Sequence, residues 1–316
     1  MQVESAALIT SIQDSGRTGY LRFGLPPSGP MDWWAFRAAN RLVGNPPGSA
    51  CMEIGMTDCS LRMAGAALVA VCGAGYRVYR DQHEIPLWMS YLVKPGDRIQ
   101  FIKTSGGSWA YLAVHGGIQS EAWLGSRSIY SRGSLGRCLQ DGDELPVAAL
   151  TSRSRTVAGR TFPVRLQPSY STQSVLRVIA GPETSRFTSE SLADFYTQAY
   201  QVSTQSDRMG YRLDGPSIRH TGSADVVSRG MAMGEIQVPG SGQPIVMMAD
   251  HPTTGGYTSL GAIARVDWPL LAQSSPGEAT IRFTRTTLEE SQKQLTQLIH
   301  AIDSYQYDQE DQWIHL

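Results

Sequence analysis

D-H-P-T-T-G-G-Y, at residues 250–257, follows a short apolar run at residues 244–249 whose length suits a buried strand. Its two glycines permit positive φ and let backbone N–H groups come close to a ligand. Its proline biases the preceding histidine toward an extended conformation. The stretch predicts a pre-shaped loop after a strand, carrying side chains that exchange protons. The alternative is a glycine turn whose Asp and Thr satisfy their own backbone.

Short apolar strands followed by glycine turns recur along the chain. Residues 66–72 read A-A-L-V-A-V-C before a glycine, and residues 109–115 run into a glycine pair. Strand signals at intervals of roughly ten residues favour a β-barrel or sandwich over βαβ units. Residues 3–13 read as a further strand. Helical spacing is confined to residues 31–43, 189–200, 267–273 and 287–305.

Helix-end signals accompany two of these helices. Asp32 lies in the first turn predicted for residues 31–43, where a carboxylate complements the helix dipole. Ser191 and Asp194 have a spacing that resembles a capping box. Both features support the predicted helices.

A change of composition divides the chain. Residues 148–173 are rich in Ser, Thr, Arg and Pro and show neither helical nor strand periodicity, which is typical of a linker. We therefore expect one domain at 1–147, a linker at 148–173, a second domain at 174–284, and a C-terminal helix and tail at 285–316. The tail, 307–316, is expected to be loose or docked on a neighbour.

Composition excludes several classes of protein. The net charge of −1 across 316 residues gives no reason to expect nucleic acid or an anionic membrane as partner. The four cysteines form no CxxC pair and have no histidines at zinc spacing, so no metal site is predicted. The chain has no G-x-G-x-x-G motif between a strand and a long helix and no G-x-x-x-x-G-K-[ST] motif, so no nucleotide-binding motif is found. The N-terminus lacks a signal-peptide pattern, and the expected location is cytoplasmic.

Four polar, glycine-bearing loops are candidates for a site: 14–20, 28–32, 206–212 and 250–257. Loops grouped at one end of a β scaffold are where function usually resides. Asp207 and Arg208 could form an ion pair that pins a turn. With Arg212 they could equally grip a carboxylate or phosphate, because guanidinium groups match such oxyanions.

These loops belong to an ordered series of motifs. The chain resembles the biotin-dependent carboxyltransferase-like family, which includes the C-subunit of prokaryotic 5-oxoprolinase (the KipA type) and the carboxyltransferase part of urea amidolyase. The resemblance covers about residues 3–283. It rests on D-S-G-R-T-G-Y (14–20), P-P-S-G-P-M-D (26–32), A-N-R-L-V-G-N (39–45), L-G-S-R-S (124–128), G-R-C-L-Q-D-G-D (136–143), S-D-R-M-G-Y-R-L-D-G (206–215), G-E-I-Q-V-P (234–239), G-Q-P-I-V (242–246) and D-H-P-T-T-G-G-Y (250–257).

The resemblance implies two cyclophilin-like β-barrel domains with a ligand cleft between them. It also implies a KipI-like companion, the B-subunit of 5-oxoprolinase, and commonly a third protein, the A-subunit. That assembly opens 5-oxoproline to glutamate with ATP, which another protein of the assembly or an unfamiliar pocket would bind. One alternative is a biotin-dependent carboxyltransferase acting on a urea-like substrate. Another is a non-catalytic KipA-type partner that antagonises a KipI-like inhibitor of a sensor kinase.

The sequence departs from the family pattern in two places. After Tyr257 the family commonly has Pro and then Lys or Arg, whereas this chain has Thr258 and Ser259. The absence of that cation and of a biotinyl-carrier motif weakens the hypothesis of a carboxyltransferase that acts on a urea-like substrate. Residues 124–137 also carry serines where glycine is more usual.

The predicted site combines the loops at 28–32, 206–212 and 250–257 with Gln237. Asp250 and His251 are the predicted catalytic residues, because either can exchange a proton once its environment shifts its pKa. The predicted substrate-binding residues are Ser28, Asp32, Asp207, Arg208, Tyr211, Arg212, Gln237, Thr253, Thr254, Gly255, Gly256 and Tyr257. If these roles hold, Asp250→Asn and Arg208→Met abolish turnover with nearly unchanged stability. In the competing view Asp207 and Asp250 each pin their own loop.

Overall fold

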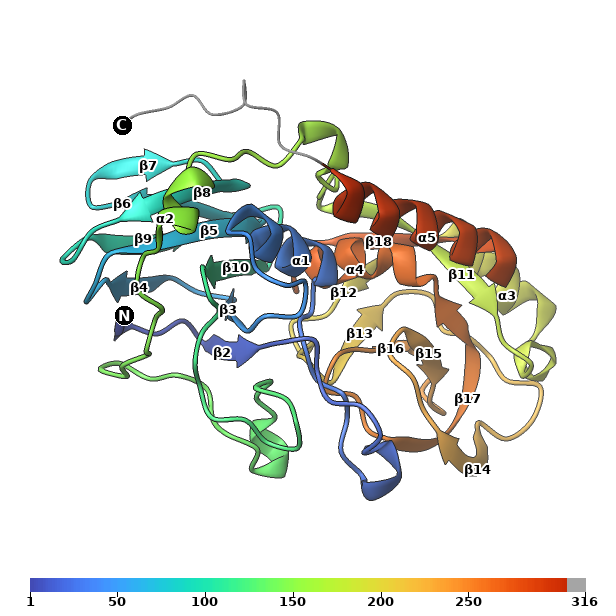
Figure 1. The fold of residues 1–316 in the computed structure, drawn as a ribbon. Coiled ribbons are helices and arrows are strands. Elements are labelled where there is room, and N and C mark those ends of the chain that lie inside the picture. The colour runs from blue at the N-terminus through green and yellow to red at the C-terminus, as the bar shows by residue number, and fades with distance from the viewer. Residues whose placement is uncertain (306–316) are drawn as a thin grey trace. The chain divides into compact units, whose positions relative to one another are not determined.

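The computed structural model describes residues 1–305, which form two compact units (Figure 1). Unit 1 contains Met1–Arg17, Ser28–Pro168 and, of the described residues, 302–305, and unit 2 contains Thr18–Pro27 and Ser169–Ala301. Both units are built mainly from antiparallel strands, so the prediction of a mainly β chain is confirmed. The tail predicted at 307–316 lies outside the described residues.

Unit 1 consists of two five-stranded antiparallel sheets. The first has the order β1 (Gln2–Ser5), β4 (Cys59–Arg62), β9 (Arg98–Lys103), β6 (Tyr76–Arg80), β7 (His83–Ile85). The second has the order β2 (Ile9–Gln13), β3 (Cys51–Gly55), β10 (Trp109–Val114), β5 (Ala67–Gly73), β8 (Met89–Val93). Residues 3–13, predicted as one strand, therefore form two strands in different sheets. That prediction was wrong because the chain crosses between sheets at residues 6–8 without a glycine or proline to mark the turn.

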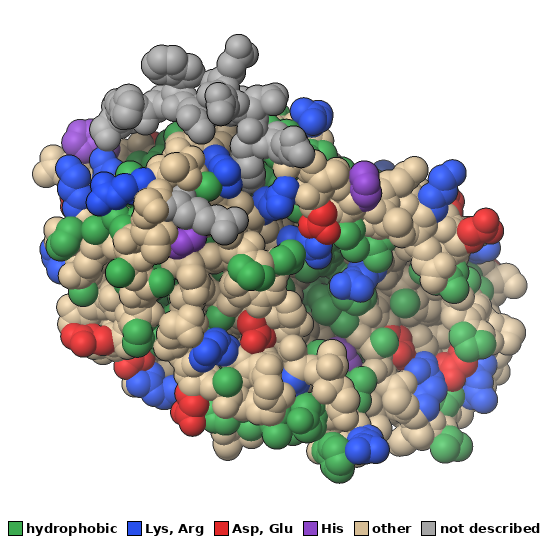
Figure 2. Space-filling model, in the orientation of Figure 1, with side chains coloured by type: hydrophobic (Ala, Val, Ile, Leu, Met, Phe, Trp, Pro, Cys, Tyr) green, Lys and Arg blue, Asp and Glu red, His purple; other side chains and the backbone are tan. Residues whose placement is uncertain are grey.

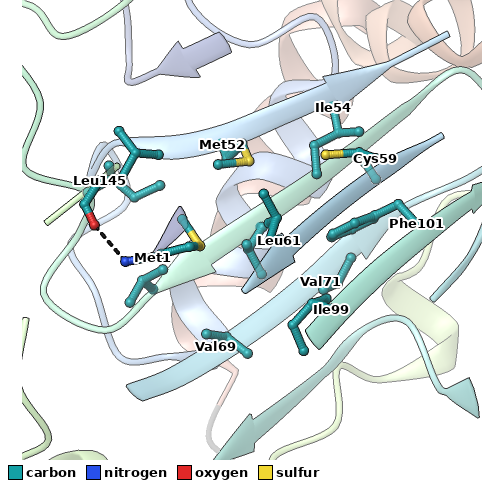
Figure 3. Packing of buried hydrophobic residues seen from close by; sticks show 14 of the residues in the cluster. Met1, Met52, Ile54, Cys59, Leu61, Val69, Val71, Ile99, Phe101 and Leu145 are labelled. Carbon is teal, nitrogen blue, oxygen red and sulfur yellow. Dashed lines mark hydrogen bonds between the residues drawn. The ribbon is translucent and has the colours of Figure 1, made fainter. Parts of the chain in front are cut away.

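The core of unit 1 lies between its two sheets. Figure 3 shows Leu61 and Phe101 from the first sheet packed with Met52 and Val71 from the second. Helix α1 (Trp33–Leu42) lies against β5 and β10 of the second sheet. That sheet is therefore covered on both faces, which explains why β5 is apolar throughout rather than alternating.

The N-terminus of α1 is fixed by buried polar groups. Asp32, predicted within the first turn, is instead the N-cap, one position before the helix begins, and accepts hydrogen bonds from the N–H groups of Trp34 and Ala35, each 3.0 Å long. The Asp32 N–H donates to the Tyr111 hydroxyl at 2.8 Å, which in turn donates to Glu53 at 2.7 Å. This chain of hydrogen bonds ties the helix to the central strands of the second sheet.

Residues predicted as the start of the linker pack on unit 1. They include the short helix α2 (Ser152–Thr156). The backbone N–H of Phe162 donates to the Trp88 carbonyl at 2.7 Å, and the Phe162 side chain is fully buried. The division of the chain therefore differs from the predicted ranges, since residues up to Pro168 belong to unit 1.

Unit 2 is a closed arrangement of strands. Its eight-stranded sheet has the order β11 (Gln173–Ala180), β18 (Thr280–Thr286), β12 (Tyr200–Val202), β13 (Gly210–Asp214), β16 (Ile245–Met247), β15 (Glu235–Val238), β17 (Thr254–Ile263), β14 (Asp225–Gly230). β11 also pairs with β17, which closes seven of these strands into a barrel, and β14 extends the edge of β17. Only the β11–β18 pair of this sheet is parallel within residues 1–305.

Helices flank the barrel of unit 2: α3 (Ser189–Thr197), α4 (Trp268–Gln273) and α5 (Leu288–Ser304). Phe195 of α3 stacks on Phe283 of β18 with ring centroids 4.4 Å apart, which fixes the helix on the sheet. The N-cap of α3 is Thr188, whose hydroxyl accepts from the Ser191 N–H at 3.3 Å. The capping residue predicted at Ser191 was therefore placed three residues too late.

Single-turn 3₁₀ helices complete the structure: η1 (Leu21–Phe23), η2 (Ser131–Gly133), η3 (Val164–Leu166), η4 (Thr184–Arg186) and η5 (Arg265–Asp267). Within residues 1–305, no helix is long and apolar enough to span a membrane. Figure 2 shows acidic, basic and hydrophobic side chains intermixed on the face it presents. This surface fits the near-zero net charge of the sequence.

Candidate functional site

The stretch 250–257 is half loop and half strand. Residues 250–253 connect β16 to β17, and β17 begins at Thr254. Gly255 and Gly256 therefore lie in an extended strand, and neither has a positive φ. The predicted use of these glycines for a left-handed loop was wrong, because β14 pairs with this part of β17 and holds it extended.

Arg208 and Asp250 form a buried ion pair. Arg208 Nε donates to Asp250 Oδ2 at 2.8 Å and Nη2 donates to Oδ1 at 3.1 Å, so the pair is bidentate. The two side chains are only 10% and 12% exposed. The Asp250 backbone N–H also donates to the Arg208 carbonyl at 2.8 Å. Both carboxylate oxygens are therefore engaged by the arginine, which links the loop after β16 to the loop before β13.

His251 lies beside this pair with one ring nitrogen fixed. The residue is 2% exposed, and Nδ1 lies 2.8 Å from the Pro252 carbonyl oxygen. A carbonyl oxygen can only accept, so Nδ1 carries the proton of this hydrogen bond. In the neutral ring, Nε2 then presents a lone pair, and it has no hydrogen-bond partner among residues 1–305. His251 is thus oriented to accept a proton at Nε2.

The other predicted residues of segment 206–212 lie in the turn before β13 or in β13 itself. Asp207 Oδ1 accepts from the N–H groups of Met209 and Gly210 at 2.8 and 3.3 Å, which pins its own turn. Tyr211 is fully buried and donates to the Ala272 carbonyl at 2.9 Å, whereas Arg212 is exposed on the other face of β13. The geometry around Asp207 and Asp250 accordingly favours the competing view, in which each carboxylate holds a loop.

Gln237 and Gly255 are close together although they lie on different strands. A Cβ added to Gly255 would stand 2.7 Å from Gln237 Nε2 and 2.3 Å from Met231 Sδ. Gln237 is 3% exposed, and its Nε2 is enclosed without a hydrogen-bond partner. Glycine is therefore required at position 255 because a larger side chain would collide with Met231 and Gln237, and not because the backbone has a positive φ.

The remaining predicted residues of unit 2 lie near the start of β17. The Thr253 carbonyl accepts from the Met231 N–H at 3.0 Å, while Thr254 and Tyr257 are exposed. The structure thus brings together Arg208, Asp250 and His251 as one group, and Gln237 with Gly255 as another.

A charged group at the wall of unit 2 was not singled out from the sequence. Arg229 of β14 pairs with Glu235 of β15 at 2.8 Å and approaches Glu183 at 3.5 Å. The hydrogen bond to Glu235 is the main reason the pKa of Arg229 is raised. Glu183 in turn accepts from the Ser259 N–H at 2.6 Å. Glu235 lies within the quoted G-E-I-Q-V-P motif, so that motif was the available signal.

Unit 1 has a polar node of its own. Asp14 Oδ1 accepts from the Ser126 and Ser128 hydroxyls at 2.5 and 2.7 Å, and Oδ2 accepts from the Arg127 N–H at 2.6 Å. Arg17, 2% exposed, donates to the Ser28 hydroxyl at 3.2 Å. Ser126 and Ser128 of the L-G-S-R-S motif therefore bind Asp14 and fix the loop at 124–128.

Ser28 is the strained residue of this node. It is 8% exposed and has φ of 56°, which is unusual for a residue with a side chain. Its neighbour Gly29, with φ of 84°, packs against the backbone of residues 14–16. The candidate loops at 14–20 and 28–32 thus meet where Gly29 packs on residues 14–16, and Asp32 caps the helix that follows.

A surface hollow of about 810 Å³ in unit 1 is lined by none of the predicted site residues. Its polar lining comes from Arg62, Gln2 and Glu144. Within the described part of the chain, no three His, Cys, Asp or Glu side chains are grouped closely enough to hold a metal ion. The candidate chemistry of unit 2 therefore resides in the 206–212 and 250–257 segments and in β15.

Comparison with known proteins places most of the chain in one family model. Residues 23–285 match the model described as carboxyltransferase domain, subdomains A and B. The chain is 34% identical over 297 residues to the 5-oxoprolinase C-subunit of Escherichia coli strain K12, an alignment covering 93% of each protein. It is 32% identical over 287 residues to the 5-oxoprolinase C-subunit of Haemophilus influenzae, covering 90% of each.

A solved structure shows the same arrangement of strands and helices. The crystal structure of the K. lactis urea amidolyase matches with a TM-score of 0.89 and 28% sequence identity. That match covers 100% of this chain and 20% of the urea amidolyase chain. The chain is thus similar to proteins of two named activities. The match covers nearly the whole length of the 5-oxoprolinase C-subunits but only a fifth of the urea amidolyase.

Proposed function

The chain belongs to the carboxyltransferase domain family, subdomains A and B, and on that premise we propose that it is one subunit of a 5-oxoprolinase complex. Such a complex opens 5-oxoproline to glutamate with hydrolysis of ATP. The observation that carries the proposal is the 34% identity to a 5-oxoprolinase C-subunit over 93% of both proteins. The urea amidolyase match, in contrast, covers 20% of that protein.

The group around His251 suits the hydrolysis of a lactam. A lactam is a stable amide, so water must be deprotonated and the carbonyl activated before the ring opens. His251 holds its Nδ1 proton on the Pro252 carbonyl, which leaves Nε2 to accept a proton from water. Arg208 is engaged by both oxygens of Asp250, so in this proposal the pair positions the loop that carries His251.

ATP supplies the activation of the lactam oxygen in this proposal. The sequence has no nucleotide motif, so in this proposal a companion protein or an unfamiliar pocket binds the nucleotide. The proposed companions are the KipI-like B-subunit of 5-oxoprolinase and the A-subunit. The purified chain alone is accordingly expected to show negligible ring opening.

The test is ATP-dependent release of glutamate from 5-oxoproline by the chain co-purified with its companions. In His251→Asn the side-chain amide can still donate to Pro252, but no acceptor stands at the position of Nε2. We expect a loss of roughly 100-fold or more in kcat, within the usual contribution of a general base. His220→Asn is the matched control, since His220 packs on Phe187 in the same unit and is not a predicted site residue. Full activity of His251→Asn would eliminate the proposed base.

A second candidate is a biotin-dependent carboxyltransferase component acting on a urea-like substrate, favoured by the TM-score of 0.89 to a urea amidolyase. Thr258 and Ser259, which replace the usual Pro and cation, are buried in the barrel wall. Thr258 donates to the Ala224 carbonyl at 2.8 Å. Urea-dependent ATP hydrolysis that requires a biotin carboxylase would support this candidate. A stable complex without either turnover would support a non-catalytic regulatory role.

A further inference from the structure

A buried amide in unit 2 has unused hydrogen-bonding capacity. Gln237 is 3% exposed, and its side chain makes no hydrogen bond to any residue of 1–305. Only Nε2 is fully enclosed, so Oε1 keeps a narrow opening. Buried polar groups are nearly always paired, because an unmade hydrogen bond costs about 1–3 kcal/mol. The unpaired amide therefore needs an explanation other than packing.

The surroundings of Gln237 leave room for its amide and cover it with a flexible group. The amide lies where a side chain at position 255 would be, and the thioether of Met231 lies against the same spot. Met231 is 5% exposed and belongs to the connection between β14 and β15. Methionine side chains change conformation easily, so this one can move aside for a ligand.

The same unit contains an example of what such an amide binds. Gln243 accepts from the Gly215 N–H at 3.3 Å and donates to the Gly215 carbonyl at 3.2 Å. A carboxamide thus forms two hydrogen bonds at once with an N–H and a C=O that face the same way. A lactam ring likewise presents an N–H and a C=O on one edge, because its amide is held cis.

We propose that Gln237 binds the cis-amide edge of the substrate, donating from Nε2 to its carbonyl oxygen and accepting at Oε1 from its N–H. The inference rests on the function proposed above, in which the substrate is the lactam 5-oxoproline. A ureido ring presents the same edge, so the chemistry is shared by the two candidate substrates. Because the amide offers a donor and an acceptor, either orientation of its two ends permits the pairing.

The experiment measures binding of small probes to the full chain, alone and with its co-expressed companions, by NMR of ¹³C-labelled methionine methyl groups. Met231 is the reporter, assigned with Met231→Leu. 2-Pyrrolidinone is the cis-amide probe, and N-methylacetamide, whose amide is trans, is its matched control. 2-Imidazolidinone supplies the ureido edge.

We expect 2-pyrrolidinone to shift the Met231 signal saturably and N-methylacetamide to leave it unchanged at the same concentration. Gln237→Met should raise the Kd for 2-pyrrolidinone by about 10- to 100-fold, since two buried hydrogen bonds are lost. Gln243→Met should leave the Kd unchanged. Equal binding of the cis and trans probes, an unchanged Kd in Gln237→Met, or no saturable binding under either condition would overturn the inference.

Thermal stability gives a second readout that separates binding from a structural role. Gln237→Met removes an unpaired buried amide and keeps the side-chain length, so its Tm should equal or exceed that of the unsubstituted chain. Gln243→Met loses two hydrogen bonds that are formed, so its Tm should fall. A clear fall in Tm for Gln237→Met would mean that the amide supports the fold, contrary to the proposal.

The two proposals can fail separately. If the complex releases no glutamate but 2-imidazolidinone binds in a Gln237-dependent way, the amide site stands and the oxoprolinase function falls. If the complex releases glutamate and Gln237→Met has an unchanged KM for 5-oxoproline, the function stands and the amide site falls.

Discussion

Removal of one partner of the Arg208–Asp250 pair should destabilise unit 2. Arg208→Met leaves the Asp250 carboxylate in a setting that is 12% exposed, without the two hydrogen bonds of 2.8 and 3.1 Å that satisfy it. Asp250→Asn leaves the guanidinium opposite a neutral amide. The sequence alone led us to expect that both variants keep their stability. Because the pair is buried, we now expect both to be less stable than the unsubstituted chain.

The magnitude follows from the burial of both charges. Breaking a buried ion pair by removing one partner costs about 3–5 kcal/mol, because an uncompensated charge remains. For a unit of this size each kcal/mol lowers Tm by about 2–4 °C, so Arg208→Met should lower the unfolding transition of unit 2 by about 6–20 °C. Asp250→Asn should have a smaller effect, since an amide oxygen can still accept from Arg208. The double variant should recover about 1–3 kcal/mol relative to the sum of the single changes.

The assay combines thermal unfolding with hydrogen exchange, because two units need not unfold together. Peptides covering residues 206–214 and 245–257 should exchange faster in Arg208→Met, while peptides from unit 1 should be unaffected. Arg77→Met is the matched control, because Arg77 pairs with Glu84 on the surface, where the two side chains are 57% and 46% exposed. Its Tm should be indistinguishable from that of the unsubstituted chain.

Two results would refute this reasoning. One is a Tm for Arg208→Met within the error of the unsubstituted chain, which would mean that the charge left behind is solvated. The other is strict additivity of the single variants, which would show that the two side chains are not coupled. If Arg208→Met remained stable but the complex lost turnover, the arginine would instead be available to hold substrate, as the sequence allowed.

Three further perturbations test the structure elsewhere. Asp14→Ala should destabilise unit 1 by about 2–4 kcal/mol and speed hydrogen exchange in the loop at 124–128, since three of that loop's groups donate to this carboxylate. Thr188→Ala should lower the Tm of unit 2 by about 2–4 °C through loss of a helix cap worth about 1 kcal/mol, whereas Thr188→Ser should not. The pKa of Glu4 is lowered, mainly by its hydrogen bond with Arg98. The ionised Glu4 therefore stabilises the folded chain fully above the ordinary pKa of about 4.3, and this stabilisation is lost as the pH falls through the lowered pKa. Glu4→Gln should therefore lower Tm at pH 6 and have no effect well below pH 4.3, as a fluorimetric pH series would show; an equal effect at both pH values would contradict this assignment.

The sequence predicted the chain's local elements well where the pattern is strong. Helix α1 lies within the predicted range 31–43, and α5 within 287–305. Strand β5 has nearly the predicted bounds because it is apolar throughout. Asp32, predicted within the first turn, is the N-cap of α1, and the N-cap of α3 is Thr188, three residues before the predicted Ser191, since several residues able to cap occur close together there.

The candidate site was predicted as a set of loops rather than as a geometry. The ordered motifs led to Arg208, Asp250, His251 and Gln237, and the structure pairs Arg208 with Asp250, which precedes His251 in the chain. The partnerships among them join residues 42 positions apart in the chain, as for Arg208 and Asp250. Residue types alone left open whether these charges bind a ligand or each other, because both uses require the same guanidinium and carboxylate.

By itself, the sequence determined the mainly β class, the apolar strands, the two long helices and the family to which the chain belongs. The class, the strands and the helices depend on periodicity over a few residues, whereas the family depends on a series of motifs in a fixed order along the whole chain. Only the tertiary structure decided that residues 3–13 split between two sheets, that Gly255 is required for space, and that Gln237 is buried without a partner. Each of these depends on which distant strand lies alongside, and strand register is set by the packing of the whole unit rather than by neighbours in the chain.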